Sequence, residues 1–428
     1  MNDSPGVADH RTELLRMLIF NRGNGLQDKG RLDDAETVFR KAVDLSGKWV
    51  TEFPNVAELR VLQAHSHNGL GHTLWRMRRS QEGETECGKA LELFEKLVAD
   101  FPNTVEYQSH VANCHSQQGG FFARDNKPRP AEEAYRKSVA AFKKLAGDFP
   151  DVRDYRHELG RSHNWLGILL AGTGRLQEAE QEHRQAVDLY EKLIQEVDHL
   201  AAQWHRRELA WSYGHLAKVL QTGQRLEEAE AAYRQALALC EKLDTDFPAA
   251  ETYGNWIAGN CQSLASLLAA SGRPDEAEKL FRRLLELKPK NALAHNNLAW
   301  LLATSPDPKF RDAGRAVELA KKAVELDPKS EFIWNTLGVA HYRAGEWKAA
   351  IEALAKSEEL ATGRYFGFNA VFLAMANWQL GEPDEARKWY DQAVEWMEKN
   401  KPQDEELRRF RTEAAELLGI EKKDVRSP

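Results

Sequence analysis

Cysteine, proline and long apolar runs are all scarce in this chain of 428 residues. The 4 cysteines form no CxxC pair and lie inside helical patterns, so we expect reduced thiols in a core: Cys87, Cys114, Cys240 and Cys261. The run Met17 to Phe20 is too short for a secretory signal, and no run approaches the roughly 18 apolar residues of a membrane span. These absences predict a cytoplasmic protein with no membrane contact.

Strong charge of one sign is also absent. The formal net charge is -7, with 59 basic and 66 acidic residues. Nucleic acids require a clustered basic face, which this sequence does not offer. We therefore expect no nucleic-acid partner. RNA binding by a helical-repeat array stays an alternative, which tight and salt-sensitive RNA binding would support.

Catalytic motifs are missing as well. The sequence holds no HExxH, no GxSxG, no phosphate loop and no kinase signature, and no strand pattern exists to carry one. The many carboxylates, such as Glu178, Glu180 and Glu182, open helices, where negative charge suits the helix dipole. We expect no enzyme activity, no cofactor and no metal site.

What the sequence does contain is a repeated unit, seen best from Ser162 to Val197. Apolar residues before and after Gly174 form two stripes at helical spacing. Gly174 suits a left-handed helix end between them. The unit therefore predicts two antiparallel amphipathic helices that meet at the small residues Gly167 and Ala179. One such hairpin cannot bury both stripes alone, so it needs stacked neighbours.

The unit recurs along almost the whole chain. Gly23, Gly71, Gly119 and Gly167 follow one another at steps of 48 residues, and Ala179 aligns with Ala35, Gly83 and Ala131 at the same step. Later copies place Ala229, Ala277, Ala316, Ala350 and Ala386 at the position of Ala179. The sequence thus predicts nine hairpins.

The step of 48 residues is long, and Phe-Pro pairs mark the end of the added length at Phe53, Phe101, Phe149 and Phe247. We expect both helices of repeats one to six to be about two turns longer than usual. From Ala265 onward the step falls to 34, then 39 and 36.

The eighth unit, Trp334-Asn335-Thr336-Leu337-Gly338 followed by Ala350, keeps the Trp, Leu, Gly and first Ala of the pattern Trp-x2-Leu-Gly-x2-Tyr…Ala-x3-Phe…Pro. Over roughly residues 12 to 400 the chain resembles the tetratricopeptide repeat family. The resemblance implies an all-α fold: a right-handed superhelical α-solenoid of about nine hairpins plus a C-terminal capping helix. It also implies that the first helix of each unit lines a concave face.

We expect four segments: a disordered N-terminus over residues 1–10, long-period repeats one to six over 11–290, ordinary-length repeats seven to nine over 291–400, and a capping helix with a polar tail over 401–428. The cap, Asp404 to Leu418, places its charged residues at outer positions: Glu405, Arg408, Arg409 and Glu413. The first repeat opens with Leu14, Leu15, Leu18, Ile19 and Phe20 and carries no polar outer face.

The concave face supplies the candidate binding residues. Asn68, Asn164, Asn296 and Asn335 occupy equivalent positions, next to the place of Trp334. An Asn amide both donates and accepts, so it can hold a peptide backbone, as the resemblance implies for related arrays. Packing between units is the alternative role. Around them lie aromatic and basic residues suited to an interface anchor: His72, Trp75, Arg76, Lys218, Trp300, Tyr342 and Arg343. The recurrent His67, His115, His163 and His295 are expected to be core histidines rather than metal ligands.

These features predict a non-catalytic scaffold or adaptor that binds a partner peptide or helix in the concave groove. Two alternatives remain. The first repeat, which carries no polar outer face, favours self-assembly into a homo-oligomer. In addition, two stretches, Asn296 to Thr304 and Trp334 to Arg343, resemble arrays that follow serine/threonine kinase domains in bacterial signalling proteins. That resemblance implies a regulatory or sensor role beside such a kinase, although this chain has no kinase domain.

Overall fold

The computed structural model describes residues 5–198, 202–246, 251–360 and 366–420, and within those ranges every regular element is a helix. The chain packs into two compact units, Met1–Leu239 and Cys240–Pro428. The boundary falls inside α11 (Leu226–Asp246). This division by packing is a different property from the change in repeat length that we expect near residue 290. None of the helices in these ranges carries an apolar stretch of the length that a bilayer crossing needs.

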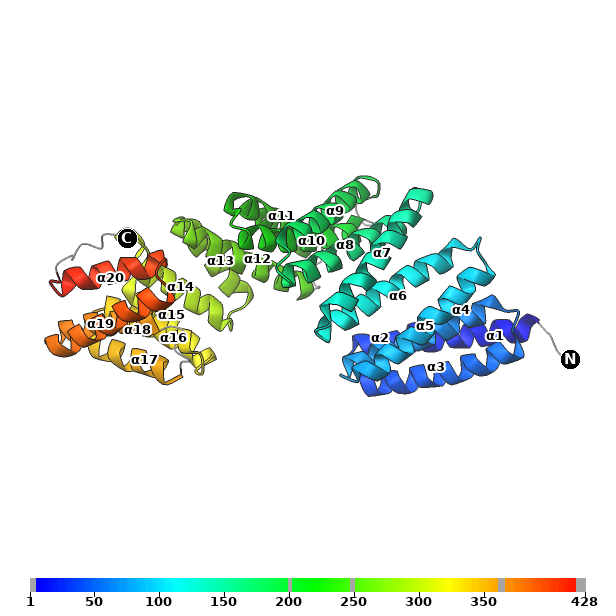
Figure 1. Ribbon diagram of the computed structural model, residues 1–428, viewed down its shortest axis with the longest axis horizontal. Coiled ribbons are helices and arrows are strands. Elements are labelled where there is room, and N and C mark those ends of the chain that lie inside the picture. The colour runs from blue at the N-terminus through cyan, green and yellow to red at the C-terminus, as the bar shows by residue number, and fades with distance from the viewer. Residues whose placement is uncertain (1–4, 199–201, 247–250, 361–365, 421–428) are drawn as a thin grey trace. The chain divides into compact units, whose positions relative to one another are not determined.

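Unit 1 consists of successive helical hairpins (Figure 1). Its helices are α1 (Pro5–Arg16), the π-helix η1 (Met17–Gly23), α2 (Asn24–Asp28), α3 (Leu32–Glu52), α4 (Ala57–Arg76), α5 (Ser80–Asp100), α6 (Val105–Arg124), α7 (Pro128–Asp148), α8 (Arg153–Gly172), α9 (Leu176–Gln195) and α10 (Ala202–Thr222). The expected disorder over residues 1–10 is not what the described part shows, since α1 begins at Pro5. Residues 1–4 lie outside the described ranges.

Unit 2 continues the same alternation (Figure 1). Its helices are α12 (Glu251–Ala270), α13 (Pro274–Leu287), α14 (Ala292–Thr304), the short 3-10 helix η2 (Pro308–Phe310), α15 (Ala313–Leu326), α16 (Glu331–Arg343), α17 (Trp347–Leu360), α18 (Phe366–Gln379), α19 (Pro383–Asn400) and α20 (Glu405–Leu417). Across the described ranges the predicted succession of helical hairpins, followed by a C-terminal helix, is therefore confirmed.

Helix length follows the repeat period. The helices from α3 to α12 have 20 or 21 residues, whereas those from α13 to α18 have 13 or 14. The difference is about two turns. One detail was wrong: repeat six is a hybrid, with a long α12 and a short α13. The Phe-Pro pairs act as expected, because α3, α5 and α7 end directly before Phe53, Phe101 and Phe149. Phe247 lies outside the described residues.

Small residues set the distance between the two helices of a hairpin. Ala179 is completely buried, and a Cβ built on Gly167 would lie 2.8 Å from the His183 ring. In the second hairpin, a Cβ on Gly71 would lie 2.9 Å from the backbone oxygen of Gly83. No side chain fits at such distances, so this spacing of small residues fixes the register of the hairpins.

Candidate functional site

The clearest pocket of the described residues lies in unit 2, on the side where the first helices of the last three repeats meet. We call the surface formed by α14, α16 and α18 the first-helix face of unit 2. The pocket has a volume of about 470 Å³, which is within the usual range for binding pockets. Its walls are Leu293, Asn296, Asn297, Trp300, Phe332, Asn335, Thr336, Phe368, Lys401 and Glu406. Three of the predicted residues, Asn296, Trp300 and Asn335, are thus brought together here.

The two predicted asparagines of the pocket, Asn296 and Asn335, differ in how their amides are used. Asn335 is only 3% exposed, and its Nδ2 donates to Asn369 Oδ1 at 2.7 Å. Asn369 in turn donates to Ser357 Oγ at 3.0 Å, so this amide is held in a fixed network. Asn296 is 5% exposed, and its Nδ2 donates to Asn297 Oδ1 at 3.2 Å. Its own Oδ1 is buried without any hydrogen-bond partner. The pocket therefore presents one orphaned acceptor beside a fixed amide.

An aromatic wall closes one side of the pocket. The Trp300 ring packs edge-on against Phe368 and Phe410, with ring centroids 6.1 Å apart in both cases. Its Nε1 donates to Glu406 Oε1 at 3.2 Å. Burial raises the pKa of the Glu406 carboxyl, although the positive charge of Arg409 and the Trp300 hydrogen bond oppose this rise. A half-buried carboxylate of α20 is thus part of the site.

Tyr342 and Arg343 lie further along the same face, beneath α20. Arg343 forms an ion pair with Glu413, with Nη2 2.8 Å from Oε2. Its guanidinium also lies over the rings of Tyr342 and Phe372, at 5.6 and 5.4 Å from their centroids. The Nε atom of Arg343 is buried without a partner. Both predicted residues are therefore at the first-helix face, but the chain's own helix covers them.

This arrangement corrects the expected role of the α20 charges. Glu405 and Arg408 are exposed, as expected of outer positions. Arg409 instead donates to the backbone oxygen of Thr304 at 2.7 Å, and Glu413 pairs with Arg343. Helix α20 packs onto the first-helix face with its apolar stripe. Charged residues on both sides of that stripe therefore also contact α14 and α16.

The candidate residues of unit 1 are placed differently. Asn164 is completely buried, donating from Nδ2 to Ser212 Oγ at 2.7 Å, while its Oδ1 lies 3.1 Å from His183 Nδ1. It is a satisfied core residue and offers nothing to a ligand. Lys218 is exposed on α10. Asn68 is half-buried, with its Oδ1 3.9 Å from the Cys87 sulfur.

His72, Trp75 and Arg76 belong to the contact between the first three hairpins. The Trp75 ring packs at 5.1 Å against Phe121, and Arg124 lies over it at 4.1 Å. Burial, followed by the charges of Arg76 and Arg124, lowers the pKa of His72. Arg76 Nη1 donates to the Gln27 backbone oxygen at 2.7 Å. The structure gives these three residues packing roles between repeats.

Two of the recurrent histidines, His67 and His163, are buried core residues. His67 and His163 bond to Glu86 and Glu182 through Nδ1, at 2.6 and 2.5 Å. In the described ranges no cluster of three or more His, Cys, Asp or Glu side chains has the geometry to hold a metal ion. All four cysteines are free and buried. Burial raises the pKa of the Cys114 thiol to about 12.

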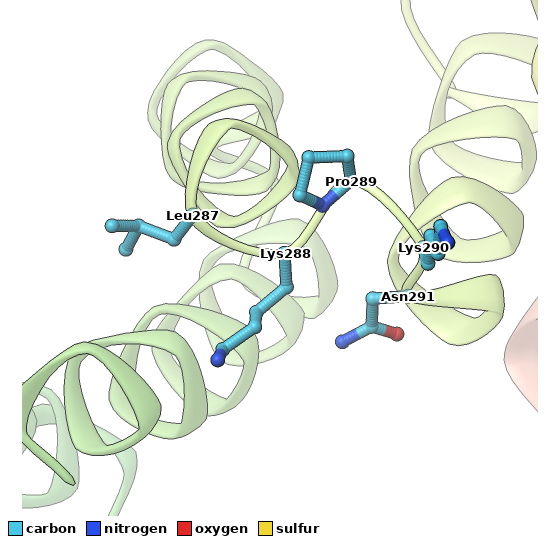
Figure 2. A pocket seen from close by; sticks show the side chains of 5 residues that line it. All are labelled: Leu287, Lys288, Pro289, Lys290 and Asn291. Carbon is cyan, nitrogen blue, oxygen red and sulfur yellow. The ribbon is translucent and has the colours of Figure 1, made fainter. Parts of the chain in front are cut away.

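A second hollow, of about 520 Å³, lies at the turn between α13 and α14. It is lined by five consecutive residues, Leu287 to Asn291 (Figure 2). Figure 2 shows their side chains spreading apart, with Leu287 and Lys288 pointing in different directions. Without polar groups that converge on one point, this hollow has the character of a surface depression at a turn.

Several residues of the pocket were missed by sequence reasoning: Leu293, Asn297, Phe332, Thr336, Phe368, Lys401 and Glu406. Asn297 and Thr336 directly follow the two predicted asparagines, so the repeat alignment held a signal for them. Lys401 and Glu406 could not be found this way, because their position depends on how α20 folds back onto the face.

Three family models match the chain, and each is described as a tetratricopeptide repeat. One matches residues 263–331 and 309–364, the second 164–201 and 209–243, and the third 370–400. A search of curated proteins found no match.

Several solved structures are similar to the chain. RapI in its apo form is 15% identical, over 81% of this chain and 99% of that one, with a TM-score of 0.44. A tetratricopeptide repeat protein from Parabacteroides merdae is 13% identical, over 71% and 98%, with a TM-score of 0.44. YrrB, described as having an unusual peptide-binding site, is 16% identical, over 53% and 95%, with a TM-score of 0.36.

Proposed function

The chain is a protein of the tetratricopeptide-repeat family, and from this premise we propose that it is a non-catalytic adaptor. It holds a segment of a partner protein at the first-helix face of unit 2. The observation that carries the proposal is Asn296, a residue that lines the pocket and whose buried Oδ1 atom has no hydrogen-bond partner.

An unsatisfied buried acceptor costs about 1–3 kcal/mol, and a bound donor would recover that cost. A peptide backbone supplies an N–H at every residue except proline, whatever its sequence. The amides of Asn297 and Asn335 stand on either side, and Trp300 and Phe332 provide apolar walls. This combination of a few polar groups in an apolar pocket suits a peptide segment with one anchoring side chain.

The test separates binding from folding. Asn296→Ala removes an unused buried acceptor together with the long hydrogen bond to Asn297, so the two effects on the free energy of unfolding should nearly cancel. Asn335→Ala also breaks the bond to Asn369 and should destabilise the protein. Asn400→Ala, exposed at the end of α19, is the matched control.

Each variant would be used as bait for affinity capture from a native lysate, followed by titration of the captured partner. We expect Asn296→Ala to weaken partner binding by about tenfold, or 1.4 kcal/mol, with Asn400→Ala unchanged. Equal capture by Asn296→Ala and wild type would contradict the proposal.

A second candidate function, self-association through the first repeat, is favoured by one observation. Leu14, Met17 and Phe20 are 38%, 51% and 44% exposed and follow one another along α1 and η1. An exposed apolar strip of this kind marks an interaction surface more often than a single exposed residue does. Light scattering over a concentration series would detect association, and Met17→Glu should abolish it. A monomer at every concentration would rule this candidate out.

A further inference from the structure

The helix α20 lies on the first-helix face as a bound ligand would. Glu406, Phe410 and Glu413 follow one another at i, i+4 and i+7, so they share one side of the helix. Glu406 accepts from Trp300 Nε1, and Glu413 pairs with Arg343. Between them the Phe410 ring enters an aromatic socket of Trp300, Phe368 and Phe372, with centroids 6.1, 6.3 and 5.0 Å away. This is the contact pattern of an amphipathic helix in a groove.

We infer that the first-helix face of unit 2 is a receptor for a partner α-helix with an acidic–aromatic–acidic pattern at i, i+4 and i+7, and that α20 is its internal competitor. The inference rests on the proposed function and gives the partner segment its chemistry. A partner of this kind binds by displacing α20.

The charges of the face select the acidic ends of such a helix. Burial, and then the positive charge of Arg343, lower the pKa of Arg311. Glu413 pairs with Arg343, and the negative charges of Glu413 and Asp307 oppose the lowering at Arg311. At the other end the indole N–H of Trp300 is a donor and so requires an acceptor. The aromatic socket lies between these two points.

The internal helix is an incomplete ligand. With α20 in place, Arg343 Nε and Asn296 Oδ1 both remain buried without partners. The connection between α19 and α20 is short, running from Lys401 to Asp404. A short tether gives α20 a high effective concentration, so it holds the face despite incomplete contacts. A free helix can satisfy these atoms with its side chains or with the unpaired N–H groups of its first turn. Such a helix has the stronger contacts, and it binds once α20 is released.

A peptide of this chain's own residues 404–420, labelled with a fluorophore, is the probe, and the full-length protein is the receptor. Glu406→Gln with Glu413→Gln weakens α20 in its own chain but leaves the side-chain volumes and the probe unchanged. Glu405→Gln with Glu416→Gln makes the same charge change at exposed positions of the same helix, and is the matched control.

We expect wild type and the control to bind the probe weakly. The Glu406→Gln, Glu413→Gln protein should bind it about tenfold tighter, because the fraction of open face rises. Adding Arg343→Ala to this protein should remove the gain. Phe410→Ala is a second way to open the face and should also tighten probe binding. If Phe410→Ala loses its helicity, only the Glu406→Gln, Glu413→Gln protein is used to test the inference.

Two results would overturn the inference: no gain over the control in a fully helical protein, or a gain that survives Arg343→Ala. The first would make α20 a permanent cap, and the second would mean that the probe does not bind at Arg343 of the first-helix face. The probe experiment involves no partner, so it is independent of the proposed function. If Asn296→Ala still weakens partner capture, the proposed function stands while the competition fails. If the probe binds as expected but Asn296→Ala does not change partner capture, the competition by α20 stands while the proposed function fails.

Discussion

Arg79 of the second hairpin reaches back to Glu36 of the first, with its Nη1 atom 2.9 and 2.8 Å from the two carboxylate oxygens. The same guanidinium holds Glu82 of its own hairpin, at 2.6 Å from Nη2 to Oε2. Two further arginines repeat this link between a carboxylate of the preceding hairpin and one of their own: Arg175 with Glu132 and Glu178, and Arg225 with Glu180 and Glu228. The glutamates that open the second helices therefore also join consecutive repeats of unit 1.

A double-mutant cycle on Arg79→Gln and Glu36→Gln should show a favourable coupling in thermal unfolding. Burial works against ionisation of Glu36, but its hydrogen bonds from Arg40 and Arg79 lower the pKa of the carboxyl. The coupling should exceed that of the exposed pair Glu133 and Lys137 within α7, which is the control. Both couplings should shrink in 1 M salt. A coupling at Arg79 no larger than the control would mean that the link is only a surface contact.

The turns between paired helices carry a second testable feature. Each of eight turns places one residue in the left-handed region: Gly30, Arg78, Asn126, Gly174, Gln224, Gly272, Gly345 and Gly381. Arg78 and Gln224, at φ 64° and 62°, bear a side chain that disfavours this conformation. Arg78→Gly and Gln224→Gly should each raise the free energy of unfolding by about 0.5–1 kcal/mol.

Two comparisons make the turn prediction specific. Asn126→Gly should gain less, because Asn adopts the left-handed conformation more readily than Arg or Gln. Gly174→Ala, at φ 81°, should instead lose about 1–2 kcal/mol. Urea unfolding measures all four variants. A destabilising Arg78→Gly would show that the Arg side chain contributes more than its backbone strain costs.

The repeat pattern predicted the architecture well because it reflects steric limits that each hairpin meets by itself. Ala179 and Gly167 lie where two helices nearly touch, so only small residues fit at these positions. The Phe-Pro pairs end helices for a local reason, since proline cannot continue them. Such features depend on residues close in the sequence, and they could be predicted from it.

The role of each asparagine could not be predicted in this way. Asn164 and Asn296 occupy equivalent positions, but Ser212 and His183 satisfy the first, whereas the oxygen of the second has no partner. What a neighbouring helix offers to the amide decides between packing and binding. The position of α20 depends likewise on distant contacts: Trp300 with Glu406, 106 residues apart, and Arg343 with Glu413, 70 residues apart. The predicted resemblance to kinase-associated arrays stays a prediction.

Overpacking a hairpin tests the predicted register directly. Ala179→Leu inserts three carbon atoms where the structure leaves no space, so it should cost about 1–3 kcal/mol of unfolding free energy. Gln181→Leu adds a leucine to an exposed position of the same helix and should change stability by less than about 0.5 kcal/mol. Equal effects of the two substitutions would show that α8 and α9 do not meet at Ala179.

Buried histidines should make unit 1 sensitive to acid. Burial, and then a neighbouring histidine, lower the pKa of His65 and of His157 to about 4 and that of His183 to about 3. The His65 ring packs against Phe20, Phe94 and His110, and Glu106 of α6 is the carboxylate beside His110. An unfolded histidine titrates near 6.5, so the unfolded chain takes up protons first as the pH falls.

Stability should therefore be complete above about pH 6.5 and decline as the pH falls from 6.5 towards 4. For His65 alone the loss by pH 5 is about 2 kcal/mol. Urea unfolding at pH 7.5 and pH 5.0 measures it. Because a glutamine takes up no proton, His65→Gln should reduce the difference between the two pH values, whereas His10→Gln, at an exposed position of α1, should not. The carboxylates with lowered pKa add a further loss of stability only below about pH 4.5. Equal stability of wild type at pH 7.5 and 5.0 would therefore contradict the predicted effect of the buried histidines.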